Sequence, residues 1–473
     1  MRFIHTADWH LGNSMYHVDR ASEADAFLKW LRERIVAEKA DALIVSGDVF
    51  DTVNPPTDAR KKYFSFLSSL KDTPCKSVII TGGNHDSGML LDAPASVLED
   101  IGGLSVHVVG SMVERTVDDA VFELYGASGE VCGICAALPF MREMDVRRLR
   151  PEDDSDVESL FASVYADALA AAEKLRGGRD IPVIATGHLY AADLEGRPVG
   201  EGACVTGSEN SVVAAENAHD ADGLALIDTS DSKDAASSDV DDSSDDGVRP
   251  LDIVGKLGRI HSSVFPAGFD YVALGHIHYT TMVARNPKIR YSGSPFVLGF
   301  DEAPFSHHVL CVDVSREKQP DVTKLVVPPT LHFMRVSGTA SELAAKLAEL
   351  SANPVWPADS FFIEVCHTPE LGLNIHEALE SVLKDAPFTV ANWKIQKTEG
   401  ADVSGFYDAG VDGAGQLTEK DIFSMLVEAK TKFAVGSEEH NAVMDELYPL
   451  FMEISAGLST GENGKNGSEG GLQ

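Results

Sequence analysis

An α/β fold is predicted by two observations near the start of the chain: short apolar runs that end in turns, and amphipathic segments between those runs. The runs "RFIHT", "DALIVSG" and "SVIITGG" have the composition of buried strands. The segments that separate them, "SEADAFLKWLRERIVAEKA" and "TDARKKYFSFLSSLK", carry apolar residues at helical spacing. Strand, helix, strand, helix, strand is typical of an α/β layer with parallel strand pairs.

Later elements are predicted in the same way. Strands are expected at "VFELYG", "VCGICAAL", "IPVIATG", "FDYVALG" and "HVLCVDV", and a helix at "SLFASVYADALAAAEKL". From about Arg316 the pattern becomes a β-α-β-α-β set, with strands at "LHFMRVSG", "FFIEVC" and "FTVANWKIQK" and helices at "ASELAAKLAEL" and "IHEALESVLK". This set is large enough for a small second domain.

The chain therefore divides into a large first domain and several smaller parts. We expect the first domain over residues 1–315, a small α+β domain over 316–400, a Gly-rich linker over 401–416, two amphipathic helices over 417–455 and a low-complexity tail over 456–473. The tail is expected to be disordered.

The formal net charge of −35 argues against nucleic acid as a partner, because duplex binding rests largely on Lys and Arg side chains that neutralise phosphates. The negative charge is unevenly distributed along the sequence. Residues 209–247 hold twelve acidic residues and one basic residue, Lys233, and we expect this acidic insert to be disordered. The rest of the chain is still acidic, so contact with DNA would need local basic patches, bound metal ions or a partner protein.

The sequence lacks the signals of export or membrane insertion. No signal-peptide stretch opens it, and no run approaches the roughly 18 apolar residues of a spanning helix. Its six scattered cysteines do not resemble a disulfide framework, and the pair in "VCGIC" fits buried thiols in a strand better than a zinc site. A cytoplasmic location is predicted.

Residues with metal-ligand chemistry follow the predicted strands at the points where those strands end. They are Asp8, His10, Asp48, Asn84, His85, His188, His276 and His278. In an open α/β sheet, groups just beyond the carboxyl ends of neighbouring strands converge on one crevice. An Asp-x-His pair on an extended segment points both side chains to the same side, so we expect Asp8 and His10 to hold one ion together and His276 and His278 to do the same.

Leaving His85 aside, these residues offer carboxylates, imidazoles and one amide but no thiolate, which suits Mn, Fe or Zn. They are too many for one ion. If Asp48 bridges, two ions each receive four protein ligands, at the separation of roughly 3.5 to 4 Å that is typical of two-metal phosphoester hydrolysis. His85, next to Asn84, would be free to act as a donor or general acid toward a phosphate.

Each of these short motifs alone is more often a capped turn or a structural histidine, and only their joint occurrence at strand ends favours a metal site. Supporting or turn roles are expected for Asp51, Asp86 and Asp301. Seven histidines do not belong to these motifs and are interpreted as structural or surface residues: His5, His17, His107, His219, His261, His307 and His308.

The ordered set "DWH", "GDVFD", "GNHD", "GH" and "GHIH" resembles the motifs of the calcineurin-like metallophosphoesterases. More narrowly, "HTADWHLG", "GDVFDTVNPP", "GGNHDS", "DYVALGHIH" and "YSGSPFVLGFDE" resemble the SbcD family, the nuclease subunits of bacterial SbcCD complexes. The resemblance covers most of residues 1–315. It implies a four-layer sandwich of two β-sheets flanked by helices, with a small α+β capping domain and C-terminal helices.

The resemblance also implies an activity and partners. The activity would be Mn²⁺-dependent, with exonuclease action on duplex ends and endonuclease action on single strands and hairpins, in DNA repair, recombination and replication. The partners would be DNA and an SbcC-type ATPase, which a homodimer of this chain joins in a heterotetramer. The helices over 417–455 would bind that ATPase or pack on the capping domain. The chain has no Walker A motif, so ATP dependence must come from another chain.

Carried over motif by motif, the resemblance implies that Asp8, His10, Asp48 and His278 hold one ion. It assigns Asp48, Asn84, His188 and His276 to the other ion, and makes His85 the catalytic histidine. The acidic insert departs from the family, because it is longer than the family implies and lies in the loop that leads to a metal ligand.

Two other functions stay open. A phosphodiesterase or phosphatase for a small or protein substrate could use the same dimetal site, although "GDVFDT" lacks the Arg that follows this motif in protein phosphatases. A non-enzymatic scaffold that bridges DNA ends would not need the intact ligand set. Arg20, Arg60 and Lys61 are candidate DNA contacts, but a solvated helix face explains them equally well.

Overall fold

The computed structural model describes residues 1–98, 102–191, 260–368 and 374–395, with a few further residues between 427 and 448. The chain splits into two compact units, Met1–Gln396 and Lys397–Gln473, and the elements below all belong to the first. The acidic insert, the predicted linker and the tail lie outside the described residues, as do nearly all of the predicted helices over 417–455.

The first sheet has six strands, and its centre is formed by the three N-terminal strands that the sequence predicts. In spatial order they are β14 (Asp321–Val326), β13 (His308–Asp313), β1 (Arg2–Thr6), β4 (Ala42–Ser46), β5 (Ser77–Thr81) and β6 (Ser105–Val109). From β1 to β6 the neighbours are parallel, and β13 pairs antiparallel with β1 and with β14. The carboxyl ends of β1, β4 and β5 therefore meet at one edge.

The second sheet also has six strands. In spatial order they are β11 (Thr281–Val283), β12 (Asn286–Tyr291), β10 (Tyr271–Gly275), β9 (Val183–His188), β8 (Val131–Ala136) and β7 (Val121–Tyr125). Its four central strands run parallel, while the hairpins β7–β8 and β11–β12 close its two sides.

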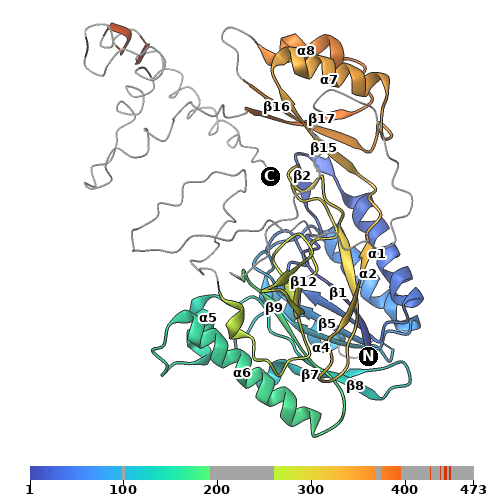
Figure 1. The fold of residues 1–473 in the computed structure, drawn as a ribbon, viewed down its shortest axis with the longest axis vertical. Coiled ribbons are helices and arrows are strands. Elements are labelled where there is room, and N and C mark those ends of the chain that lie inside the picture. Colours follow the sequence, from blue (N-terminus) through green and yellow to red (C-terminus); the bar gives the residue numbers. More distant parts are fainter. Residues whose placement is uncertain are drawn as a thin grey trace, which may run out of the picture. The chain divides into compact units, whose positions relative to one another are not determined.

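The two sheets pack face to face and are covered by helices on their outer faces (Figure 1). On β4, Ala42 and Ile44 join the core between the sheets, and the alternating residues Leu43 and Val45 pack under α1 (Ala21–Ala37) and α2 (Thr57–Ser69). The helix α6 (Val157–Arg176) covers the second sheet. This arrangement is the helix–sheet–sheet–helix sandwich that the resemblance implies.

Local signals fix the ends of α6. The side chain of Asp156 caps its first turn by accepting a hydrogen bond from the Ser159 N–H, at 2.9 Å. The chain leaves the helix at Gly177, whose left-handed backbone (φ 61°) a residue with a side chain would adopt only with strain.

Several shorter elements connect these layers. They are β2 (Ser14–Met15), β3 (Val18–Asp19), α3 (Gly88–Asp92), α4 (Ala95–Leu98), α5 (Glu143–Leu149) and single 3₁₀ turns at Leu70–Asp72, Asp118–Ala120 and Ser262–Val264. The sequence did not predict these elements or the strands β6, β11, β12 and β14.

A third sheet confirms the predicted β-α-β-α-β set. The strands β15 (His332–Gly338), β16 (Phe361–His367) and β17 (Thr389–Ile395) are parallel, and the helices α7 (Ala340–Ala352) and α8 (Ile375–Leu383) connect them. These elements share a core of their own. A capping box starts α7, because Thr339 and Glu342 each accept a hydrogen bond from the other's backbone N–H.

Arg20 is neither a DNA contact nor part of a solvated helix face, so both explanations that the sequence left open for it are wrong. Its side chain is buried, with Nη2 2.6 Å from Glu23 Oε2. Its guanidinium carbon lies 5.4 Å from the ring centre of Phe296 and 5.6 Å from that of Phe333 on β15. Arg20 therefore ties the third sheet to the first helix of the sandwich.

Among the described residues, none of the helices has the length and apolar character to cross a membrane.

The interpretation of His5 as a structural residue agrees with its position. It is fully buried in β1, and its ring nitrogens contact the Tyr271 hydroxyl at 3.1 Å and the Leu274 carbonyl at 3.2 Å.

Burial lowers the pKa of His5 to about 3, so the folded protein keeps this ring neutral where the unfolded chain, with the ordinary value of 6.5, binds a proton. The His5 contribution to stability is therefore complete above pH 6.5 and falls as the pH drops from there toward 3. The free energy of unfolding therefore falls with decreasing pH below 6.5. We expect His5→Gln to reduce this pH dependence by up to about 1.4 kcal/mol per pH unit. Urea unfolding between pH 7.5 and 5.5 measures it, and the exposed His376→Gln serves as the control; an unchanged slope in His5→Gln would contradict the assignment.

Candidate metal centre

All eight predicted site residues lie just beyond or at the carboxyl ends of five strands. Asp8 and His10 follow β1, Asp48 follows β4, Asn84 and His85 follow β5, His188 ends β9, and His276 and His278 follow β10. The first two loops are joined by backbone hydrogen bonds from the Asp8 N–H to the Gly47 carbonyl and from the His10 N–H to the Asp48 carbonyl, both 3.0 Å. The edges of both sheets thus contribute to one centre.

The backbone that presents these side chains is not extended, so the extended segment predicted for Asp8 and His10 is wrong. Asp8, His10 and Asp48 have φ values of 54°, 43° and 49°, and His276 has 101°. A positive φ is uncommon in residues other than glycine and is concentrated at functional sites. Left-handed turns after the strands, and not the alternation of a strand, direct these side chains.

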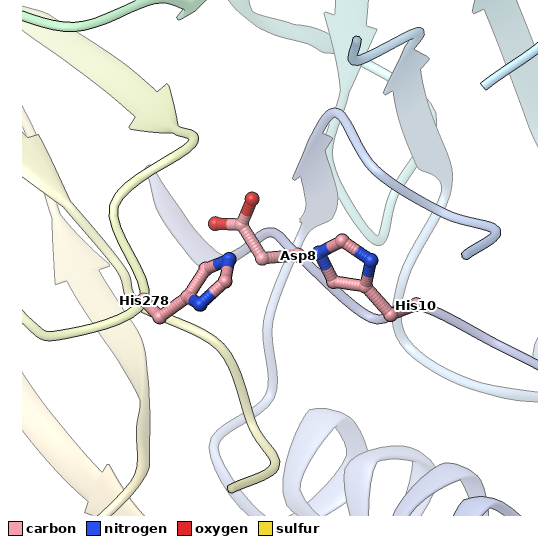
Figure 2. A group of neighbouring side chains, drawn as sticks. All are labelled: Asp8, His10 and His278. Atoms are coloured by element: carbon pink, nitrogen blue, oxygen red, sulfur yellow. The ribbon is translucent and has the colours of Figure 1, made fainter. Parts of the chain in front are cut away.

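One group of possible ligands consists of Asp8, His10 and His278, whose ligand atoms lie within 4.8 Å of one another. Figure 2 shows both rings facing the Asp8 carboxylate, His278 from the loop after β10 and the other two from the loop after β1. Asp8 and His10 belong to the same group, whereas His276 adjoins the other group and is separate from His278.

A second group consists of Asp8, Asp48 and His188, and Asn84 and His276 adjoin it. Asn84 Oδ1 lies 3.0 Å from His188 Nε2 and 3.0 Å from His276 Nδ1. Asp48 Oδ2 lies 3.2 Å from His188 Nε2 and 3.7 Å from His10 Nε2. Asp8 therefore belongs to both groups, and the Asp48 carboxylate of the second group approaches His10 of the first.

The ring orientations of two histidines are fixed from outside these groups. His188 Nδ1 lies 2.9 Å from the Ser46 carbonyl, and His278 Nδ1 lies 2.9 Å from Glu302 Oε1. Such contacts select the tautomer that leaves Nε2 for an ion. The sequence reasoning missed Glu302, because "GFDEAP" has no spacing that marks its glutamate as a partner of a histidine.

Asp86 has the supporting role that was expected. Its carboxylate accepts hydrogen bonds from the backbone N–H groups of Val49, Phe50 and Gly83, at 2.9 to 3.1 Å. The loops after β4 and β5 are thereby held together. Burial raises the pKa of Asp86 to about 6, and the nearby charge of Asp48 adds to that rise.

His85 lies at the rim of the centre, where its side chain is exposed. Its Nδ1 is 3.0 Å from the Asp51 carbonyl, and its backbone N–H donates to Asp48 Oδ1 at 2.9 Å. The His85 ring is 4.8 Å from the His10 ring, centre to centre. His85 therefore contacts Asp48 of the second group through its backbone and His10 of the first group through its ring. Its Nδ1 is engaged by the Asp51 carbonyl, which leaves Nε2 as the nitrogen for another molecule.

The buried charges of the centre act strongly on one another. Burial alone would raise the pKa of Asp48, but the imidazoles of His188 and His10 bring it well below its usual range. Burial also opposes a proton on His188, yet the charge of Asp48 raises the pKa of that histidine to about 9. At His276 burial prevails and lowers the pKa to about 3. Coordination of a cation by His188 would displace the proton that this ring holds.

The residues present fit a metal ion. Both ring nitrogens of His10 are buried and make no well-aligned hydrogen bond among the described residues; the nearest carboxylate oxygens are Asp51 Oδ1 at 3.3 Å and Asp48 Oδ2 at 3.7 Å. A buried polar atom without a hydrogen bond costs free energy. A cation between His10, Asp8 and His278 would satisfy one of these ring nitrogens. The Asp48 carboxylate can lie against the backbone of the loop after β5 only because residue 83 is a glycine: a Cβ at Gly83 would lie 2.1 Å from Asp48 Oδ1.

A sandwich of two sheets with Asp, Asn and His side chains gathered at one edge defines the class of metal-dependent phosphoesterases. Comparison with known proteins agrees, because the family model described as calcineurin-like phosphoesterase matches residues 1–225. The chain is also 31% identical to the SbcD subunit of the nuclease SbcCD from Escherichia coli K12, over 75% of this chain and 76% of that relative.

Relatives of the same name extend the match. The protein from Rhodobacter capsulatus is 28% identical over 85% of this chain and 89% of its own, and the protein from Bacillus subtilis is 27% identical over 97% and 98%. The chain therefore belongs to the SbcD family, within the calcineurin-like phosphoesterases. The predicted family, fold class and hydrolytic enzyme class are confirmed.

We expect Gly83→Ala to weaken Mn²⁺ binding by about 10-fold or more, because the new methyl group would displace the Asp48 carboxylate. Equilibrium dialysis with metal analysis measures the change. Gly129→Ala is the matched control, since its Cβ would have nothing within 4 Å and only its positive φ would be strained. Equal Mn²⁺ binding by the two variants would show that Asp48 does not need the space at Gly83.

Proposed function

We propose that the chain hydrolyses DNA phosphodiester bonds as the nuclease subunit of a complex with an SbcC-type ATPase. The observation that supports this most strongly is the convergence of seven Asp, Asn and His side chains from five strand ends on two adjoining groups. The curated relatives are named as the SbcD subunit of the nuclease SbcCD, which supports DNA as the substrate.

For the metal ligands we propose the assignment that the sequence motifs imply. Asp8, His10, Asp48 and His278 would hold one ion, and Asp48, Asn84, His188 and His276 the other. The oxygen and imidazole donors suit Mn²⁺, although they also accept other first-row ions. Bound ions of this kind supply an activated water and neutralise charge on the phosphoryl oxygens.

His85 is the proposed catalytic histidine. Its exposed ring can reach a phosphodiester at the rim of the centre, and the contact of Nδ1 with the Asp51 carbonyl limits the orientation of the ring. Because Nδ1 contacts the Asp51 carbonyl, Nε2 is the ring nitrogen that we propose to donate a hydrogen bond to a phosphoryl oxygen or a proton to the leaving oxygen. Asp51 holds this ring and also lies 3.3 Å from His10 Nδ1, so it sets the spacing of the two imidazoles.

The proposal also includes the remaining family features. The sheet of β15 to β17 with its helices would act as the capping domain over residues 316–400, and the segment 417–455 would bind the ATPase. A homodimer is proposed through α3 and α4, where Met89 is 83% exposed and Val97 is 77% exposed. The relatives are bacterial, which supports the cytoplasm as the site of action on DNA.

We expect His85→Ala to retain bound Mn²⁺ but to lose about 10²- to 10⁴-fold in DNA cleavage, because only the proton donor is removed. The assay uses a labelled hairpin duplex with Mn²⁺, with and without the ATPase partner, and the exposed His376→Ala as the control. If the wild-type protein released phosphate from small phosphoesters and left DNA whole, the phosphodiesterase or phosphatase alternative would replace the nuclease.

We expect Met89→Glu and Val97→Glu to shift the protein from dimer to monomer, because each places a charge in the proposed apolar contact. Sedimentation equilibrium measures the mass. Val355→Glu is the control, since Val355 is 54% exposed and lies in the loop after α7. A wild-type monomer, or a dimer that both charged variants retain, would refute the α3 and α4 contact.

A further inference from the structure

Glu302 lies next to the proposed metal centre and is assigned no role by the proposed function. Its side chain is 16% exposed, and Oε1 is 2.9 Å from His278 Nδ1. The contact spans 24 residues of sequence and joins the loop after β10 to the loop between β12 and β13. We propose that Glu302 is a positioning residue that fixes the tautomer and orientation of His278 and thereby sets the affinity of the ion that His278 binds.

The carboxylate of Glu302 is itself held on its other side. Its Oε2 accepts a hydrogen bond from the Leu298 N–H at 2.7 Å, and the Glu302 N–H donates to the Gly299 carbonyl at 2.9 Å. The same loop fixes the His278 main chain, whose carbonyl accepts from the Ser294 N–H at 3.0 Å. Ring and backbone of His278 are therefore oriented from one short segment.

The two proposed ion sites differ in the group that contacts the Nδ1 atom of their histidine. At His188 the outer partner of Nδ1 is the neutral Ser46 carbonyl, whereas at His278 it is a carboxylate. A carboxylate partner makes an imidazole a stronger donor to a metal ion and adds a negative charge close to it. We therefore expect Glu302 to strengthen the site of Asp8, His10 and His278 selectively. This inference rests on the proposed dimetal centre.

The test is Mn²⁺ titration of the full chain by isothermal calorimetry, comparing the wild type with Glu302→Gln. Glutamine has nearly the same shape, but an NH₂ group replaces one of the two carboxylate oxygens. It therefore cannot accept at both the Oε2 position that faces the Leu298 N–H and the Oε1 position that faces His278 Nδ1. We expect one of two sites to weaken by about 10- to 100-fold and the other to keep its affinity. The cleavage rate of Glu302→Gln should return toward the wild-type rate at correspondingly higher Mn²⁺ concentration.

Glu317→Gln is the matched control, because it makes the same chemical change at an exposed carboxylate that pairs with Arg316 and leaves the contact between Glu302 and His278 in place. Its two Mn²⁺ affinities should equal those of the wild type. Equal weakening in Glu317→Gln and Glu302→Gln would overturn the proposal, since general loss of charge would then explain the effect. So would unchanged binding in Glu302→Gln, or weakening of both sites together with a lower melting temperature.

A second pair of variants covers the case in which Glu302→Gln does not fold. Glu302→Asp and Glu302→Asn have the same length and differ only in charge, so the aspartate variant should bind the affected ion more tightly; equal affinities would overturn the proposal. The dimetal function is judged separately, by the wild type alone. If the wild-type protein binds fewer than two Mn²⁺ ions, the proposed dimetal function is contradicted, whatever the result for the Glu302 variants.

Discussion

The structure depends on the contact of the two sheets at the edge where His188 meets β4. His188 ends β9 in the second sheet, and its Nδ1 lies 2.9 Å from the Ser46 carbonyl at the end of β4 in the first. The hydroxyl of Ser46 donates in turn to the Ala273 carbonyl on β10, at 3.0 Å. These buried contacts align the carboxyl ends of strands from both sheets. Without that alignment the Asp, Asn and His side chains that follow the strands would form two separate clusters. A Cβ at Gly47 would come within 2.2 Å of His188 Nδ1, so these contacts form only over glycine.

Much of this arrangement could be predicted from the sequence, because it follows from strong local patterns. The apolar runs of β1, β4, β5, β9 and β10 are short, buried and bounded by turns, and the polar residues that follow them are recognisable by position. Strand β14 shows the limit: none of its residues is buried, and its only strand partner among the described residues is β13. Sequence pattern contains little information about such edge strands.

The finer chemistry of the centre depends on contacts between distant residues, which one sequence does not reveal. The positive φ values of Asp8, His10 and Asp48 are imposed by the loops that meet there, whereas local pattern suggested extended backbone. Glu302 acquires its partner only when the loop after β12 folds over β10. Arg20 looked like a surface cation, since its burial between Phe296 and Phe333 requires the third sheet. Charges of this kind are assigned correctly only after the tertiary contacts are known.

The burial of Arg20 also has a mechanical meaning. Its Nη1 donates to Asn13 Oδ1 at 3.2 Å, and Asn13 Nδ2 donates to Asp51 Oδ1 at 2.8 Å, the carboxylate beside His10. A continuous series of contacts thus connects an aromatic ring on β15 with the His10 imidazole at the carboxyl end of β1. Displacement of the third sheet would remove the aromatic contact of a buried guanidinium and, through Asn13 and Asp51, would alter the surroundings of the His10 imidazole.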